Sequence, residues 1–208
     1  MGKIMNSMEW VLTSLAFEEP DIVPLMLVLS TYGAKEAGIS IKEYFQFDEN
    51  IVEQQIKMKK KYSNDCYTAF KYAALEVELI GGEIVYATST PTNSGEPIIK
   101  SVKDIRDLRF PKSLKDSSST YSILNITKKL RKYSNEDTPI IGVVISPFSV
   151  PIMQMGFEEY IKLIYHNENC FWKLMRKNID FCVRWGNAQL EAGATAICYF
   201  DPLASPSM

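Results

Sequence analysis

Four short and almost continuous apolar runs alternate with longer stretches of helical periodicity along the chain. The runs cover residues 22–29, 66–70, 139–145 and 194–200. Apolar continuity over this length is typical of parallel strands that are buried on both faces. Because helical stretches separate the runs, the pattern predicts an α/β fold with four neighbouring parallel strands. The pattern alone leaves a closed barrel and an open sheet as alternatives.

Helical periodicity is found in the segments between these runs, at residues 6–17, 41–62, 74–82, 121–133 and 157–192. A polar interruption near residues 167–169 predicts a break in the last of them. Residues 82–119 depart from the pattern, because turn-forming residues crowd their first part, and they predict an excursion with hairpin character. With 208 residues, 46% of them hydrophobic, the chain can bury one sizeable core, so residues 1–208 are interpreted as a single domain.

The charges of the chain nearly cancel, with 23 Lys and Arg residues against 25 Asp and Glu residues and a net charge of -2. This balance gives no support to a nucleic-acid partner or to an anionic membrane surface. No stretch predicts a membrane span, and the N-terminal residues lack the features of a secretion signal, so a cytoplasmic location is expected. The four cysteines form no CxxC pair and are expected to be reduced thiols.

Polar groups follow the predicted strands at their carboxyl ends, where parallel α/β folds gather their working groups. Residues 30–32 follow the first run, Ser146-Pro147-Phe148 follows the third, and Asp201 follows the fourth. Asp201 gives the sharpest signal, because a carboxylate directly after an apolar run is costly to bury unless it is paired or used. An Asp that caps the following turn or helix is the alternative interpretation.

Other residues with chemical potential give weaker signals. The glycines form neither a GxGxxG nor a GxxxxGK[ST] pattern, and no GxSxG elbow is present. His166 stands four positions before Cys170, the spacing of two metal ligands on a helix, but two side chains are too few for a zinc site, and a helix-surface pair is favoured. Glu76 and Glu78 are two positions apart, so on a helix they face different directions.

Three segments carry a resemblance to a known family: ALEVELIGGEI at residues 74–84, IIGVVISPFSVPIMQMGFEEY at 140–160 and WGNAQLEAGATAICYFDPLASP at 185–206. In this order and at this spacing they resemble the uroporphyrinogen decarboxylase superfamily, whose members fold as (β/α)8 TIM barrels. Members typically have Gly-Ala-Asp before the fourth strand, where this chain has Gly193-Ala194-Thr195. The resemblance covers essentially the whole chain and implies the N-terminal portion of such a barrel, with about the first four strands.

The details resemble the methylcobamide:coenzyme M methyltransferase branch more than the decarboxylase. The decarboxylase has an Arg-rich motif after its first strand, whereas residues 28–38 here, VLSTYGAKEAG, contain no Arg. Its Phe-Ser-Asp motif aligns with Phe70-Lys71-Tyr72, so its Asp is missing. By contrast, Glu76-Val77-Glu78 resembles the Glu-Ala-Glu of the methyltransferases, and residues 201–205, DPLAS, resemble their Asp-Pro-x-Ala-Ser.

This resemblance implies transfer of a methyl group between a methylated corrinoid (a cobamide) and a thiol acceptor. A corrinoid protein or free methylcobamide and a small thiol are therefore the expected partners. In the family a zinc ion, held by a His-x-Cys motif and a later Cys, activates the thiol. Those ligands are expected downstream of residue 208, so the chain is expected to be truncated, to lack zinc ligands and to be inactive by itself.

Asp201 is the residue expected to act in catalysis, by orienting the thiol or a zinc-bound group. The expected pocket residues are Tyr72, Glu76, Ser146, Pro147, Phe148 and Ser205. A partial barrel leaves open strand edges, so a homo-oligomer is expected. Two alternatives stay open: a decarboxylase-like enzyme acting on a tetrapyrrole, and a catalytically inactive half-barrel or binding module.

Overall fold

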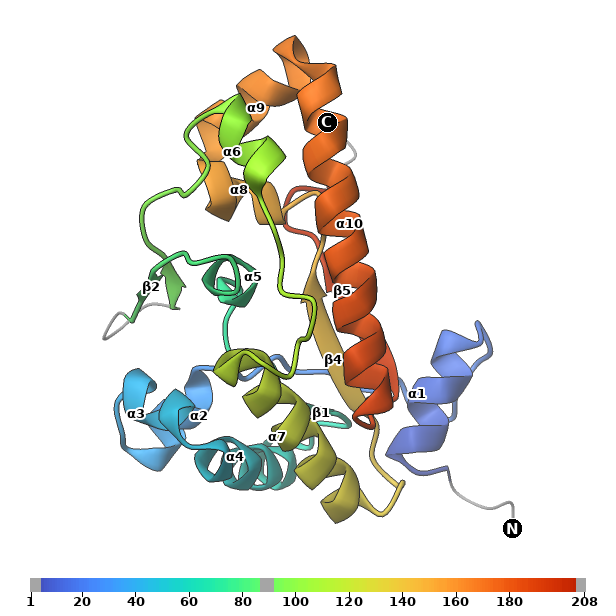
Figure 1. The fold of residues 1–208 in the computed structure, drawn as a ribbon. Helices are drawn as coiled ribbons and strands as arrows, with labels where there is room; N and C mark the ends of the chain where they lie inside the picture. Colours follow the sequence, from blue (N-terminus) through green and yellow to red (C-terminus); the bar gives the residue numbers. More distant parts are fainter. Residues whose placement is uncertain (1–4, 87–91, 205–208) are drawn as a thin grey trace. The chain divides into compact units, whose positions relative to one another are not determined.

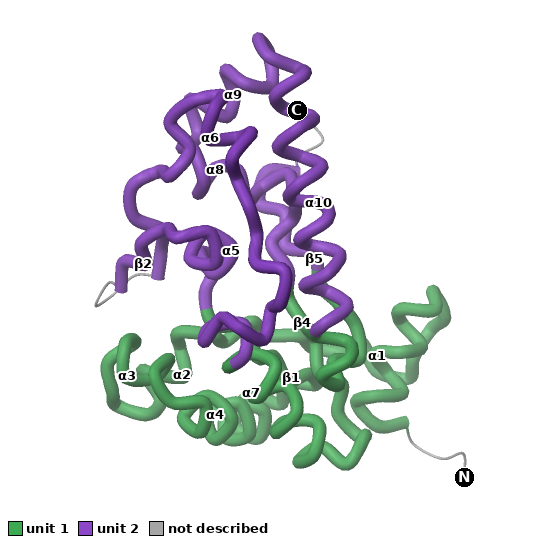
Figure 2. Tube along the Cα trace, viewed as in Figure 1, with its two compact units in different colours: residues 1–71, 122–143, 189–198 green, residues 72–121, 144–188, 199–208 purple. Residues whose placement is uncertain are grey.

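The computed structural model describes residues 5–86 and 92–204, and the chain has an α/β fold. Its internal contacts divide the chain into two compact units, which Figure 2 shows in different colours. Unit 1 comprises residues 1–71, 122–143 and 189–198, and unit 2 comprises residues 72–121, 144–188 and 199–208. The interpretation of residues 1–208 as a single domain stays a prediction.

The helices of unit 1 are α1 (Ser7–Leu15), α2 (Tyr32–Ala37), α3 (Ile41–Gln46), α4 (Asp48–Tyr62) and most of α7 (Ser118–Ser134) (Figure 1). The single helix predicted at residues 41–62 is two helices, because Phe47 takes an extended conformation between them. The short helix α2 was not predicted, since six residues are too few to display a helical period. α1 begins with a capping box, in which Asn6 and Glu9 exchange side-chain-to-backbone hydrogen bonds of 2.9 and 2.8 Å.

Three of the predicted strands are confirmed as β1 (Tyr67–Thr68), β4 (Ile140–Ile145) and β5 (Ala196–Phe200), in the order β1-β4-β5. β1 and β4 pair in parallel. The N–H of Thr195, just before β5, donates to the carbonyl of Ile140 at 2.7 Å. The N–H of Ser146, just after β4, donates to the carbonyl of Phe200 at 2.9 Å. Corresponding ends of β4 and β5 are therefore joined, so this pair also runs parallel.

All six residues of β4 are buried, as its continuous apolar run predicts. Gly142, in the part of β4 that belongs to unit 1, permits a close contact on this strand. A Cβ atom at Gly142 would lie 2.8 Å from Gln189 Oε1 and 2.7 Å from Ile197 Cδ1. The Gln189 amide uses the space to accept from Val143 N at 3.1 Å and to donate to Val143 O at 3.0 Å. This side chain thus satisfies both backbone groups of a buried strand residue.

The prediction of a buried strand at residues 22–29 is wrong. The segment has no strand structure, and five of its apolar side chains are exposed. Its amides bind side chains: Leu25 N donates to Asp65 Oδ2 at 2.8 Å, and Leu27 N donates to Asn64 Oδ1 at 3.0 Å. Because these side chains take the place of a neighbouring strand, the segment lies beside the chain that leads into β1 without joining a backbone ladder.

The burial predicted for β5 is also wrong. Its first three residues are half-buried, and Tyr199 and Phe200 are 52% and 46% exposed. β5 is the last strand in the order β1-β4-β5, so among the described strands only β4 pairs with it. A strand with a neighbour on one side only has less of its side-chain surface covered than the central strand β4.

Unit 2 contains α5 (Leu75–Glu78), β2 (Ile84–Val85), β3 (Asn93–Ser94), α6 (Val102–Asp107), α8 (Val150–Met155), α9 (Phe157–His166) and most of α10 (Glu168–Glu191). The hairpin expected within residues 82–119 is confirmed, because β2 and β3 pair antiparallel. The predicted helix break is also confirmed, since α9 ends at His166 and α10 begins at Glu168. The helix α8 was not predicted; Pro151 in its first turn is compatible with a helix start.

The core of unit 2 is built by side chains of α6, α8, α9 and α10 and of the segments before and after α6. Its buried members are Ile99, Ile105, Leu108, Met155, Tyr160, Leu163, Cys170 and Leu174. The apolar faces of α9 and α10 supply four of them, as the helical periodicity of this region predicts. In the part of the chain that the structure describes, none of the helices combines the length and the apolar character that a membrane crossing requires.

Candidate functional site

A cluster of serine and aspartate side chains lies where β4 and β5 end, in unit 2. Asp201 directly follows β5, and its Oδ1 accepts a hydrogen bond of 2.5 Å from Ser149 Oγ. Ser149 is buried just before α8, and its N–H donates to Ser146 Oγ at 3.1 Å. The structure thus brings together Asp201 and Ser146, which the sequence had singled out, and it does so through Ser149, which the sequence had not.

The hydrogen bonds of Asp201 show which of its oxygen atoms caps the following turn. The backbone carbonyl of Asp201, and not its carboxylate, accepts from Ala204 N at 3.3 Å to close that turn. The carboxylate binds Ser149 and also acts on a phenol: burial first, and then the charge of Asp201, raise the pKa of Tyr160 above its ordinary value. The half-buried carboxylate of Asp201 is therefore hydrogen-bonded to one hydroxyl group, and its charge also acts on the phenol of Tyr160. Its role in catalysis stays a prediction.

The aromatic and proline residues after β4 pack around the same part of unit 2. The rings of Phe148 and Tyr160 meet edge to face, with centroids 5.9 Å apart, and Phe148 packs against the core of unit 2. Pro147 is half-buried, whereas Ser146 is buried. Phe148 thus contacts Tyr160, the phenol whose pKa the charge of Asp201 also raises. Ser205, which was also predicted to line the pocket, lies outside the described residues.

Glu76 is the most deeply buried carboxyl group of unit 2. Only 3% of the residue is exposed, and its Oε1 accepts a hydrogen bond of 3.2 Å from Ile145 N, the last amide of β4. Its Oε2 is buried and has no hydrogen-bond partner among the described residues. Burial raises the pKa of Glu76 to about 8, against a smaller lowering by backbone hydrogen bonds. Near neutral pH the protonated form is therefore favoured, and this form carries a donor.

The thiol of Cys182 contacts the same residue of β4 as Glu76 does, which is Ile145. Cys182 Sγ donates to the carbonyl oxygen of Ile145 at 3.3 Å, while Glu76 accepts from the N–H of Ile145. Burial, and secondly the charge of Glu76, raise the pKa of Cys182 to about 12. A buried thiol with a raised pKa is a weak nucleophile. Cys182 therefore has a packing role next to Glu76, and no sequence pattern indicated that both side chains would contact Ile145.

Tyr72 is buried and takes part in a second group of polar contacts in unit 2. Its hydroxyl donates to Glu78 Oε2 at 2.8 Å, and Ser119 Oγ donates to the same oxygen at 2.8 Å. The ring of Tyr72 meets that of Tyr86 edge to face. Burial and the charge of Glu78 raise the pKa of Tyr72, so it stays a neutral donor. Glu76 and Glu78 indeed face different partners, as their spacing predicts.

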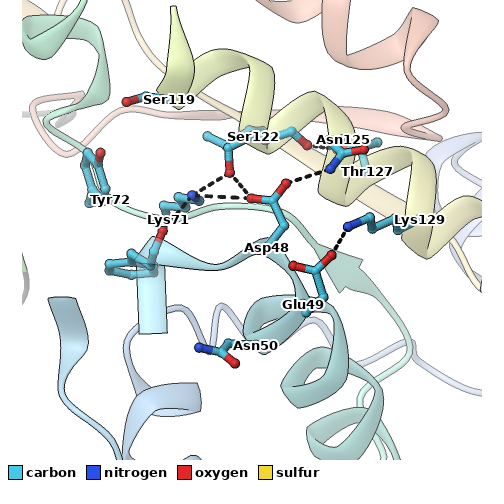
Figure 3. A network of polar contacts seen from close by, with 12 residues as sticks. Asp48, Glu49, Asn50, Lys71, Tyr72, Ser119, Ser122, Asn125, Thr127 and Lys129 are labelled. Carbon is cyan, nitrogen blue, oxygen red and sulfur yellow. Dashed lines mark hydrogen bonds and ion pairs between the residues drawn. The ribbon is translucent and has the colours of Figure 1, made fainter. Parts of the chain in front are cut away.

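A separate polar network belongs to unit 1 and centres on Lys71 (Figure 3). Lys71 is buried, and its Nζ donates to the carbonyl of Phe45 at 3.0 Å and to Ser122 Oγ at 2.6 Å. Asp48 accepts hydrogen bonds from Ser122 Oγ and from Asn125 Nδ2, and its Oδ1 lies 3.9 Å from Lys71 Nζ. Because the buried charge is paired and its hydrogen bonds are made, the network fastens α3, α4 and α7 to one another.

The described residues offer no cluster suited to a metal ion. Residues 5–86 and 92–204 contain no group of three or more His, Cys, Asp or Glu side chains placed to bind one. The interpretation of His166 and Cys170 as a pair on the surface of one helix is wrong. His166 is the exposed last residue of α9, whereas Cys170 is buried in the first turn of α10, and the break at Asn167 separates them.

Comparisons with known proteins agree on the family. A family model described as Uroporphyrinogen decarboxylase (URO-D) matches residues 6–208. The methylcobamide:CoM methyltransferase MtaA of Methanosarcina barkeri is 25% identical over 133 residues, which cover 63% of this chain and 38% of the relative. The uroporphyrinogen decarboxylase of Geobacter sp. (strain M21) is 27% identical over 143 residues, which cover 66% of this chain and 40% of the relative.

The fold is similar to a solved structure of a methyltransferase from Methanosarcina mazei, with a TM-score of 0.86 at 20% identity. The similarity covers 98% of this chain and 61% of that chain, so the chain spans less than two thirds of these relatives and of this structure. At this identity the likeness establishes the fold. Together with the family model, which matches nearly every residue, it shows that the chain belongs to the uroporphyrinogen decarboxylase family.

Proposed function

We propose that the protein transfers a methyl group between a methylated corrinoid and a small thiol. The observation that carries this proposal is the arrangement of two methyltransferase-like motifs in unit 2. Glu76, of the Glu-Val-Glu motif, binds the last residue of β4, and Asp201, of the Asp-Pro-Leu-Ala motif, directly follows β5. The similarity to MtaA, and to the methylcobamide:CoM methyltransferase MtbA of Methanosarcina mazei at 29% identity over 106 residues, supports it.

The proposal includes a (β/α)8 barrel, of which β1, β4 and β5 are consecutive parallel strands. The TM-score of 0.86 over 98% of this chain, against 61% of the solved methyltransferase, supports the interpretation of the chain as part of such a barrel. In barrels of this kind the reacting groups gather at the carboxyl ends of the strands. Asp201, Ser146 and Ser149 stand at that end of β4 and β5.

The proposed reaction moves one methyl group and one proton. The sulfur of the thiol forms the new S–CH3 bond, the thiol proton is released, and the Co–CH3 bond breaks with its electron pair left on cobalt. Asp201 would accept a hydrogen bond from the thiol or from an attendant water, and Ser149 would hold the carboxylate in place for it. Protonated Glu76 would offer its Oε2–H as a donor inside the same unit.

Zinc, which the family resemblance implies for thiol activation, is not supported by the residues that the structure describes. Residues 5–86 and 92–204 contain no suitable group of three His, Cys, Asp or Glu side chains, and the thiol of Cys182 is buried with a pKa raised to about 12. A zinc ligand must be available in its deprotonated form. No step of the proposed reaction is therefore assigned to zinc held by these residues.

The test is methyl transfer from methylcobalamin to coenzyme M by the full-length protein, followed by the absorbance of the corrinoid. We expect turnover, and we expect Asp201→Asn to lower kcat/KM by roughly 10- to 100-fold, because the amide keeps the volume but removes the charge that orients the thiol. Asp116→Asn, at an exposed position of the same unit, serves as the matched control. Normal turnover by Asp201→Asn would contradict the role of Asp201.

Decarboxylation of a tetrapyrrole is the second candidate, and the similarity to the Geobacter decarboxylase over 66% of this chain favours it. The two candidates are separated by supplying uroporphyrinogen to the same preparation. Carbon dioxide release without methyl transfer would replace the first proposal by the second. A protein that catalyses neither reaction but binds a corrinoid or a tetrapyrrole would be a binding module.

A further inference from the structure

Two grooves of unit 2 have linings of strongly positive charge. The larger has a volume of about 720 Å³, and five cations line it against the single carboxylate of Asp180. These cations are Arg106, Arg109, Lys112, Lys177 and Arg184. In a chain whose net charge is -2, such a local excess means that positive charges have been gathered on one surface.

The second groove, of about 500 Å³, extends this surface. It shares Arg106 and Lys177 with the first and adds Lys103, Lys173 and Arg176. Lys173, Lys177 and Arg184 belong to α10, four and seven positions apart, so they follow one face of the helix. With a rise of about 1.5 Å per residue, this row of cations is about 16 Å long. The two grooves form one continuous basic surface between α10 and the segment 102–112.

Backbone carbonyls, rather than carboxylates, hold the central cations. Arg109 Nη1 donates to the carbonyl oxygens of Arg106 and Leu108 at 2.7 and 2.8 Å. Lys177 Nζ donates to the same two oxygens at 2.7 and 2.8 Å. The two nitrogens are therefore at most about 5.4 Å apart, since each lies 2.7 Å from the Arg106 oxygen.

Two like charges at this separation repel each other. Burial lowers the pKa of Lys177 below its ordinary value, and the charge of Arg109 adds a smaller lowering in the same direction. A carbonyl dipole orients a cation but does not neutralise it. An anion that contacts both groups would remove the repulsion, and the remaining guanidinium nitrogens of Arg109 are held in place to bind it.

The carboxylates of this region leave most of the charge uncompensated. Asp180 pairs with Arg184, and Asp107 pairs with Arg106 at 3.5 Å in an exposed contact. Asp104 accepts from the N–H of Lys100 and from Ser101 at the start of α6. Lys103, Lys112 and Lys173 complete the lining of the grooves with further positive charge.

We propose that the groove around Arg106, Arg109 and Lys177 is a binding site for a small ligand that carries phosphate groups. Its volume lies within the range of about 300–1,000 Å³ that is usual for small-molecule sites. A phosphate group carries up to two negative charges on one centre, which matches the paired cations better than the single charge of a carboxylate does. Guanidinium groups bind phosphate oxygens through two parallel hydrogen bonds. This site is independent of the proposed methyl transfer.

The test is calorimetric titration of the full-length protein with inorganic pyrophosphate at low and at moderate salt. We expect saturable binding of one pyrophosphate per chain, weaker at the higher salt concentration because ions screen the attraction. Arg106→Gln should weaken binding about tenfold, the effect of losing one charge-assisted contact. Its side chain makes an exposed contact with Asp107, so the fold does not depend on it. Lys112→Gln is the second variant, with the same expectation.

The matched control is Lys162→Gln, because Lys162 is a cation of unit 2 that is paired with Glu158 and Glu159 away from the groove. It should bind pyrophosphate as the wild-type protein does. Adenosine diphosphate distinguishes the source of the phosphate: tighter binding than pyrophosphate identifies a nucleotide, and equal binding identifies a free phosphoanion. Three results would overturn the proposal. They are an absence of saturable pyrophosphate binding, pyrophosphate binding by Arg106→Gln and Lys112→Gln that is as tight as that of the wild-type protein, and binding of single-stranded RNA without binding of pyrophosphate.

Discussion

Replacing Glu76 by Gln removes a buried ionisable group while keeping its size and its acceptor for Ile145 N. The folded protein raises the pKa of Glu76 from 4.5 to about 8 through burial, because Oε2 has no hydrogen-bond partner among the described residues. The unfolded chain releases this proton near pH 4.5, whereas the folded chain keeps it until about pH 8. Between these values the folded state binds one more proton than the unfolded state, so its stability decreases as the pH rises.

The magnitude follows from the width of that window. Each pH unit within it lowers the free energy of unfolding by about 1.4 kcal/mol, so the loss from pH 5 to pH 7 is about 3 kcal/mol. Glu76→Gln has no proton to release and should show no such loss. We therefore compare the unfolding free energy of the variant with that of the wild-type protein. The difference between them should shift in favour of the variant by about 3 kcal/mol from pH 5 to pH 7. Cys182 does not interfere, since its pKa of about 12 keeps the thiol neutral throughout.

The assay is urea unfolding of both proteins at pH 5, 6, 7 and 8, with the difference in unfolding free energy plotted against pH. Groups other than Glu76 titrate in both proteins, and their contributions cancel in the difference. Glu96→Gln, at an exposed position of the same unit, is the matched control. The unfolding free energy of this variant should depend on pH in the same way as that of the wild-type protein. A constant difference between wild type and Glu76→Gln from pH 5 to pH 8 would show that the folded state does not retain this proton.

Two further predictions concern packing around β4. Gly142→Ala should lower the free energy of unfolding by about 1–3 kcal/mol in urea titrations, because its Cβ would lie 2.7 Å from Ile197 Cδ1 and 2.8 Å from Gln189 Oε1; an unchanged midpoint would mean that these side chains move aside. Ser149→Ala should cost about 1–3 kcal/mol in the same measurement, since it removes the buried donor to Asp201 and the acceptor of Leu203 N. Wild-type stability of this variant would show that water replaces the hydroxyl.

The buried strand β4 was predictable from the sequence, whereas the apolar run at residues 22–29 was misleading. Both runs have the composition of a buried strand. The difference depends on partners that are distant in sequence: β4 pairs with β1 and β5, whereas the amides of the earlier run bind the side chains of Asn64 and Asp65. A single sequence records composition locally and does not record which backbone groups will be adjacent after folding.

The basic surface of unit 2 was not predicted from the sequence, for a related reason. A net charge of -2 describes the whole chain, and it gave no support to a polyanionic partner. The cations of α10 and of the segment 102–112 are more than 60 positions apart and become neighbours only through folding. The helical spacing of Lys173, Lys177 and Arg184 was visible in the sequence, but the second row that faces it was not.

The Glu-Val-Glu motif shows what spacing can predict and what it cannot. Spacing alone indicates that Glu76 and Glu78 face different directions, and the structure confirms it: Glu76 binds the backbone of β4, while Glu78 accepts from Tyr72 and Ser119. It does not reveal that the first carboxyl group loses its solvent and that the second keeps hydroxyl donors. Because burial without a partner favours the neutral form, Glu76 acquires acid–base properties that its place in the motif does not reveal. An acid that stays protonated near neutral pH can donate a hydrogen bond where an ionised carboxylate can only accept one. In the proposed methyl transfer, Glu76 would therefore supply a donor carboxyl group and Asp201 an acceptor carboxylate with which to orient a thiol.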